Sequence, residues 1–92
     1  DSGHAWLAGC DLPAFLRRHA TRIAGIHVRD YRDRKSVPLG QGTVPLGDLA
    51  SAIRQARWAG WLIDEEERPN EPKPEERAVQ PSREHMRKVF GV

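Results

Sequence analysis

The stretch Ile23-Ala-Gly-Ile-His-Val-Arg-Asp30 decides the fold, because it places one imidazole at the end of a short apolar run and directly before a charged loop. Apolar runs without clean alternation are typical of parallel strands that are covered on both faces. We therefore expect a short, largely buried strand over residues 23–28. Parallel α/β proteins carry their functional groups at the carboxyl ends of strands, so this strand is predicted to deliver His27 to a site.

A helix is expected before this strand, over residues 12–19. Asp11 is a preferred N-cap residue, and Pro13 is tolerated in the first turn. The basic run Arg17-Arg-His19 suits a helix C-terminus. One apolar face should pack against the core, and it carries Leu12, Phe15 and Leu16.

A second helix, over about 45–56, has the clearest period in the sequence. Its apolar residues follow the spacing i, i+3, i+4, i+7, and they are Leu46, Leu49, Ala50 and Ile53. Trp58-Ala-Gly60 makes the turn out of this helix, and Trp61-Leu-Ile63 begins another short apolar strand. Strands that alternate with helices predict parallel pairing through right-handed crossovers.

The other segments are expected to be irregular or short. Asp1-Ser-Gly-His4 has the character of a strand end that runs into a loop, and residues 30–42 have that of a shaped loop. The proline-rich residues 69–81 predict an extended surface connection. Ser82 is then expected to cap a last helix, whose narrow apolar stripe is formed by Met86, Val89 and Phe90.

Composition limits which partners and compartment we expect. The net charge of +2 is too small to predict nucleic-acid binding from bulk electrostatics. No apolar run approaches the roughly 18 residues that cross a bilayer, so no membrane partner is expected. The single cysteine, Cys10, cannot form an internal disulfide and fits a reducing compartment. We expect a cytoplasmic protein in which Cys10 is a small hydrophobic residue rather than a nucleophile.

Three titratable residues lie near three successive predicted strand ends: Asp1, His27 and Glu65. Two carboxylates and an imidazole form a mixed O/N set suited to Mn²⁺, Mg²⁺, Co²⁺ or Zn²⁺. Each residue alone has another interpretation. His27 could be a buried histidine with its hydrogen bonds satisfied, Asp1 a loop-capping carboxylate, and Glu65 one member of a solvated acidic run. Their recurrence at the same point of three units favours a metal site, in which Glu65 is also a candidate general base.

Further polar residues flank this set. His4 follows Asp1 by three residues and is a candidate ligand, substrate partner or surface histidine. Arg29, Arg32, Arg34 and Lys35 form a basic cluster after the His27 strand, and a solvated face is the usual meaning of such a run. Of these, Arg32, Arg34 and Lys35 could reach anionic or hydroxyl-rich substrate groups, and exposed loop charges are the alternative.

Four motifs, in this order, resemble the C-terminal motifs of the xylose isomerase-like TIM barrels. They are Asp1-Ser-Gly-His-Ala-Trp-Leu-Ala-Gly-Cys-Asp11, Ile26-His-Val-Arg-Asp30, Val37-Pro-Leu-Gly-Gln-Gly42 and Gly60-Trp-Leu-Ile-Asp-Glu65. That superfamily includes sugar phosphate isomerases/epimerases, inosose dehydratases and hydroxypyruvate isomerases. The resemblance implies an α/β chain that forms the C-terminal part of a (β/α)₈ TIM barrel, from the end of strand six through helix eight. Residues 1–92 would be a partial barrel domain with strands seven and eight.

The resemblance also implies the chemistry of the site. A divalent metal (Mn, Mg or Co, with Zn less favoured) would be held by Asp1, His27 and Glu65, and Glu65 would transfer protons. His4 would contact substrate oxygens, and Arg32 or Arg34 would serve in substrate binding. The substrate would be a small sugar or polyol. The family's first metal-binding glutamate would lie in the missing N-terminal part of the barrel, so we expect the fragment alone to be inactive; a homo-oligomer of the full-length protein is compatible with this interpretation.

The sequence favours a sugar isomerase or epimerase, and three alternatives stay open. The first is an inosose dehydratase, which is a lyase built on the same scaffold. The second is a remnant without catalytic activity. Apurinic-site endonucleases of family 2 share Asp-x-x-His and Ala-Gly-x-Asp. However, they need Asp-Arg-His where this chain has Asp33-Arg-Lys35, and Thr-Pro where Glu66-Glu67 follows Glu65.

Overall fold

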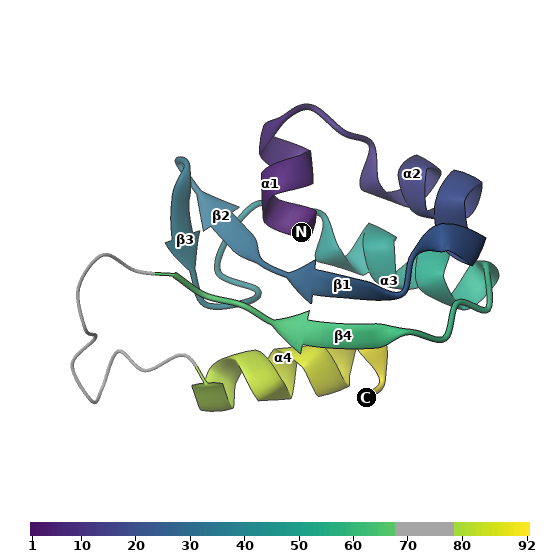
Figure 1. The fold of residues 1–92 in the computed structure, drawn as a ribbon. Coiled ribbons are helices and arrows are strands. Elements are labelled where there is room, and N and C mark those ends of the chain that lie inside the picture. Colours follow the sequence, from purple (N-terminus) through teal and green to yellow (C-terminus); the bar gives the residue numbers. More distant parts are fainter. Residues whose placement is uncertain (68–78) are drawn as a thin grey trace.

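The computed structural model describes residues 1–67 and 79–92 (Figure 1). In chain order its elements are α1 (Ser2–Leu7), α2 (Leu12–His19), a 3₁₀ turn (Ala20–Arg22), β1 (Gly25–Val28), β2 (Asp30–Arg32), β3 (Lys35–Val37), α3 (Leu46–Gln55), β4 (Trp61–Asp64) and α4 (Val79–Phe90). Every helix in this described part of the chain is too short or too polar to span a bilayer.

Strands β1 and β4 pair in parallel, so the alternation of strands and helices correctly predicts the pairing. Gly25 lies opposite Trp61, and the register continues to Val28 opposite Asp64. The backbone N–H of Glu65 donates to the Val28 carbonyl at 3.0 Å, which extends the ladder by one residue. Both carboxyl ends therefore meet at the same edge of the sheet (Figure 1).

Helices α2 and α3 supply five of the eleven residues in the core cluster of the described chain, and both helices were correctly predicted. In each helix the apolar face is buried against the even-numbered residues of β1, and the shared core includes Leu12, Leu16, Ile26, Val28, Leu46, Leu49 and Ala52. The Asp11 carboxylate caps α2 by accepting a hydrogen bond from the Ala14 N–H at 3.0 Å. Phe15 is the exception, because its side chain is half exposed rather than part of this face.

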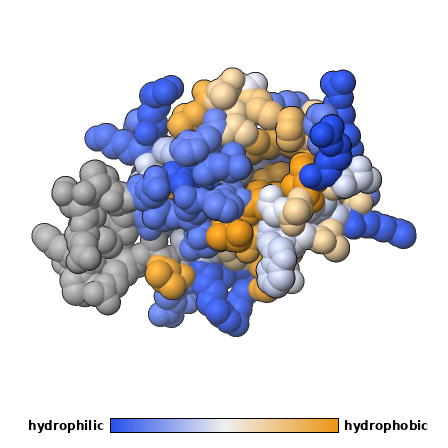
Figure 2. All heavy atoms as spheres, viewed as in Figure 1, coloured by the Kyte–Doolittle hydropathy of each residue, from blue (hydrophilic) through white to orange (hydrophobic). Residues whose placement is uncertain are grey.

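The other face of the β1–β4 pair is open, which corrects the expectation of a strand covered on both sides. Gly25 and His27 are exposed, while Ile26 and Val28 between them are buried. On β4, Trp61 is 78% exposed and Ile63 45% exposed. Figure 2 shows hydrophobic side chains on this face, beside a hydrophilic region near the carboxyl ends of the strands.

The first residues form a helix, where the sequence suggested a strand end and a loop. The Asp1 carboxylate caps α1 by accepting a hydrogen bond from the His4 N–H at 2.8 Å. Ser2 and Gly3 are buried, and Gly3 lies directly against the ring of Tyr31. Packing of this first turn on the end of β1 thus stabilises a helix whose residues have modest intrinsic propensity.

The expected loop at 30–42 contains an antiparallel hairpin, formed by β2 and β3. Asp33 and Arg34 make its turn with positive φ angles of 49° and 62°. The loop that follows is organised by the buried Asp30 carboxylate. Its oxygens accept hydrogen bonds at 2.9–3.1 Å from four backbone N–H groups, those of Tyr31, Gly40, Gly42 and Val44.

Helix α4 begins earlier than predicted, at Val79. Pro81 lies in its first turn, where a missing N–H costs no helical hydrogen bond, so Pro81 is not part of an extended connection. Ser82 is inside the helix and fully buried rather than its cap. The expected stripe is present: Met86 is buried, and Val89 and Phe90 are partly buried. Pro69, Pro72 and Pro74, from the predicted connection, lie outside the described residues.

Candidate metal centre

Asp1, His27 and Glu65 lie together, with one ligand atom from each within 4.8 Å of the other two. Nδ1 of His27 is hydrogen-bonded to Oε2 of Glu65. Asp1 and His27 are exposed and Glu65 is partly buried, so the group is open to solvent. We call these three residues the trio.

Strand alternation explains two members of the trio. Successive side chains of a strand point to opposite faces, and His27 belongs to the open, odd-numbered face of β1. Glu65 follows β4 and continues that face, beside β1 in register. The hydrogen bond from His27, with the nearby charge of Arg29, lowers the pKa of Glu65 despite some desolvation.

Asp1 is brought to the same point by the docking of α1. The Ser2 hydroxyl donates to the carbonyl of Arg29 at 3.1 Å and accepts from the Arg29 N–H at 3.0 Å. These two bonds fix the first turn of α1 to the end of β1. Asp1, directly before that turn, is thereby held beside the carboxyl end of the strand.

Arg29 is part of this centre, although the sequence suggested only a member of a basic cluster. Its side chain is 3% exposed and makes ion pairs with Asp1, Glu65 and Glu67. Burial by itself lowers the pKa of Arg29, but its hydrogen bonds to Tyr31 and Glu67 and the Glu65 charge raise it overall. The signal in the sequence was its place two residues after His27, which predicts the same face of the strand.

The three predicted substrate-binding residues differ in position. His4 adjoins the trio, with Nδ1 3.5 Å from Oδ2 of Asp1 and a side chain that is 62% exposed. Arg32 and Arg34 lie on the hairpin, where Arg32 donates to the Gln41 carbonyl and Arg34 occupies the turn. No ion pair within the described residues joins either arginine to the trio.

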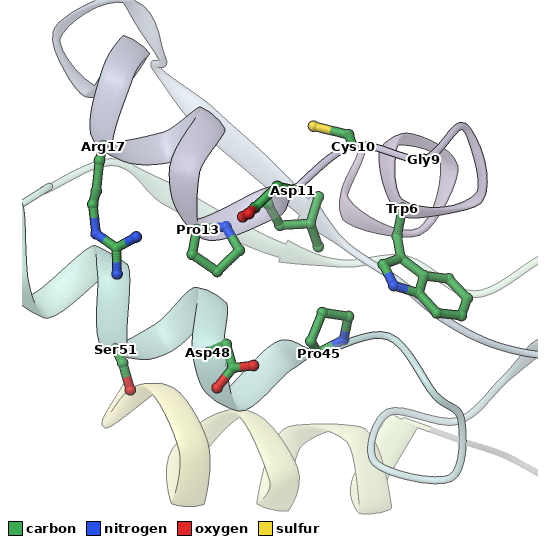
Figure 3. Close-up of a pocket in the computed structure, with 10 residues that line it drawn as sticks. Trp6, Gly9, Cys10, Asp11, Pro13, Arg17, Pro45, Asp48 and Ser51 are labelled. Carbon is green, nitrogen blue, oxygen red and sulfur yellow. The ribbon is translucent and has the colours of Figure 1, made fainter.

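A separate cavity of about 590 Å³ lies between the N-terminal ends of α2 and α3 (Figure 3). Its walls include Trp6, Cys10, Asp11, Arg17 and Asp48. It shares no residue with the trio, and Cys10, which is partly buried, is among its lining residues.

The family model described as xylose isomerase-like TIM barrel matches residues 1–89. A comparison with curated proteins finds no match.

Proposed function

The chain belongs to the xylose isomerase-like TIM barrel family, a family of enzymes, and from this we propose that it is part of a divalent-metal-dependent sugar isomerase or epimerase. It would act by proton transfer next to the carbonyl of a keto-sugar or polyol-derived substrate. In this proposal residues 1–92 contribute strands seven and eight of the barrel. The observation that carries the proposal is the convergence of Asp1, His27 and Glu65 at one edge of the β1–β4 sheet.

The donor set of the trio fits a divalent cation. Two carboxylates and one imidazole are suited to Mn²⁺, Mg²⁺ or Co²⁺, with Zn²⁺ less favoured. One ligand atom of each residue lies within 4.8 Å of the other two, which supports a shared cation. The remaining oxygens are held by fixed donors, as is usual around metal ligands: the His4 N–H contacts Asp1, and Arg29 contacts Glu65.

Glu65 is the best placed proton acceptor in this proposal. The His27 hydrogen bond holds its pKa below the ordinary value of 4.5, so the carboxylate is in the ionised form that a proton acceptor needs at neutral pH, although the same bond makes it a weaker base. A bound divalent cation would polarise the substrate carbonyl and so acidify the adjacent C–H group. Glu65 would remove that proton, and the carbon and face to which it is returned would distinguish isomerisation from epimerisation.

Substrate hydroxyls would be bound by the polar side chains around the trio. His4 is exposed and adjoins Asp1, which supports a contact with substrate oxygens. Arg32 and Arg34 would contribute from the hairpin through guanidinium hydrogen bonds. The exposed positions of both arginines are compatible with that role.

The test is turnover of keto-sugars and inososes by the protein at its full natural length, with EDTA and with added Mn²⁺, Mg²⁺ or Co²⁺. We expect metal-dependent turnover in the unsubstituted protein and its loss in His27→Ala, with little change in stability because His27 is exposed at an edge of the sheet. His19→Ala, on α2 and outside the trio, is the matched control. Unchanged turnover in His27→Ala would reject His27 as a ligand, and three tightly bound zinc ions would instead indicate an abasic-site nuclease.

A further inference from the structure

We propose that Arg29 is a positioning residue, which holds the carboxylates of Asp1 and Glu65 in the orientation that binds the cation. This inference rests on the proposed metal site. In this role Arg29 strengthens cation binding, whereas its positive charge alone would weaken it.

The guanidinium of Arg29 has a separate partner for each of its three nitrogens. Two of these contacts are ion pairs: Nε lies 3.0 Å from Oδ2 of Asp1, without the geometry of a hydrogen bond, and Nη2 lies 2.5 Å from Oε1 of Glu65. Nη1 donates to the Tyr31 hydroxyl at 3.2 Å and to Oε2 of Glu67 at 3.3 Å. A planar, forked cation can serve these directions at once, whereas an ammonium group acts as a point charge.

These contacts fix how the two carboxylates are turned. Oε1 of Glu65 faces Arg29 while Oε2 faces His27. Oδ2 of Asp1 faces Arg29 while Oδ1 accepts from the His4 N–H. Neither carboxylate can rotate without losing a partner.

Arg29 itself is held firmly, so it can act as a support. Its side chain is 3% exposed. Its backbone is bonded in both directions to the Ser2 hydroxyl, and its guanidinium carbon lies 6.0 Å from the centre of the Tyr31 ring. A buried side chain with fixed neighbours loses little further entropy when the site is used.

The charge and the geometry of Arg29 make opposite predictions. Its positive charge repels a cation, so charge alone predicts tighter binding when Arg29 is neutralised. Orientation predicts the reverse, because Asp1 and Glu65 would repel each other and turn apart without the guanidinium between them. The direction in which affinity changes therefore separates the two roles.

The experiment is a calorimetric titration of the metal-free protein, at its full natural length, with Mn²⁺. We expect Arg29→Gln to weaken binding by about 10- to 100-fold, as loss of residues that orient metal ligands commonly does, and Arg29→Lys to fall between Arg29→Gln and the unsubstituted protein. Arg17→Gln, at an exposed arginine of α2 that donates to Gln55, is the matched control and should leave affinity unchanged. Urea unfolding of each variant reports stability separately, and Arg29→Lys provides the test if Arg29→Gln does not fold.

The outcomes separate this inference from the proposed function. Mn²⁺ binding that is lost in His27→Ala but equal or tighter in the Arg29 variants would overturn the role of Arg29 alone. Absence of Mn²⁺ binding in the unsubstituted protein would overturn the metal site and, with it, this role.

Discussion

Asp64 and Glu65 are consecutive carboxylates at the end of β4, but their environments shift their pKa values in opposite directions. Glu65 contacts His27 and Arg29 on the open face of the sheet. Asp64 instead accepts a hydrogen bond from Ser82 of α4. Desolvation raises the pKa of Asp64, with the Ser82 bond opposing it, whereas the His27 hydrogen bond lowers that of Glu65. As pH rises from acid toward neutrality, the contribution of Glu65 to the free energy of unfolding should therefore increase, whereas that of Asp64 should decrease.

Glu65→Gln should remove stability that is present at neutral pH. A carboxylate whose folded pKa lies below its ordinary value of 4.5 stabilises the fold above that pH, and the contribution is lost as pH falls through the lowered pKa. The difference in unfolding free energy between the unsubstituted protein and Glu65→Gln should thus be largest near neutrality and shrink below pH 4.5. Urea unfolding in EDTA across this range measures it; a constant difference would contradict the argument.

Asp64→Asn should show the reverse trend. Because the folded pKa of Asp64 lies above its ordinary value of 3.8, its contribution is fully present below that pH and is lost as pH rises toward the raised pKa. Relative to Asp64→Asn, the unsubstituted protein should become less stable over that interval. The same urea series provides the measurement, and a trend parallel to that of Glu65→Gln would show that Ser82 outweighs desolvation.

Asp30→Asn should be strongly destabilising. An amide has one acceptor oxygen, so its NH₂ group would face backbone N–H donors that the carboxylate now satisfies. Buried donors without a partner cost about 1–3 kcal/mol each, and we expect a loss of about 2–5 kcal/mol by urea unfolding. Asp33→Asn is the matched control, because asparagine tolerates the positive φ of that exposed turn. Equal stability of the two variants would refute the role of Asp30.

Gly42→Ala should also destabilise the fold, through a steric clash. A Cβ at residue 42 would overlap the Asp30 carboxylate and the Tyr31 carbonyl, neither of which can move without breaking the loop. Overpacking of this kind costs about 1–3 kcal/mol. Gly47→Ala, in α3 with no atom near its added Cβ, should instead stabilise by about 0.5–1 kcal/mol. Thermal unfolding of both variants tests whether this difference in sign exists.

The elements that the sequence predicted correctly are those with local signals. Helix α3 has a clear period, α2 has a capping aspartate, and β1 and β4 are short apolar runs between turn residues. Helix α1 was missed because its stability comes from contacts with Arg29 and Tyr31, which are distant in sequence. The hairpin was missed because its turn uses Asp33 and Arg34 rather than the usual Asn-Gly or Asp-Gly pair.

The residues of the candidate site also divide into those with a local sequence signal and those placed by contacts distant in sequence. His27 and Glu65 were placed at strand ends from local pattern, and the structure brings them together with Asp1. The link from Asp1 to β1 could not be predicted, because it depends on Ser2 bonding to a residue 27 positions later. Arg29 was overlooked because a cluster of arginines usually indicates a solvated surface, and its burial becomes evident only with α1 in place.

The Asp30 carboxylate also determines how residues 31–44 unfold locally. Four amide hydrogens, on Tyr31, Gly40, Gly42 and Val44, share one acceptor group. Displacement of that carboxylate would release all four amides together, because they share it as acceptor. Residues 31–44 should therefore exchange their protected amides in a single cooperative event, as one subglobal unfolding unit, rather than fray as the surface loop that their polar sequence suggests.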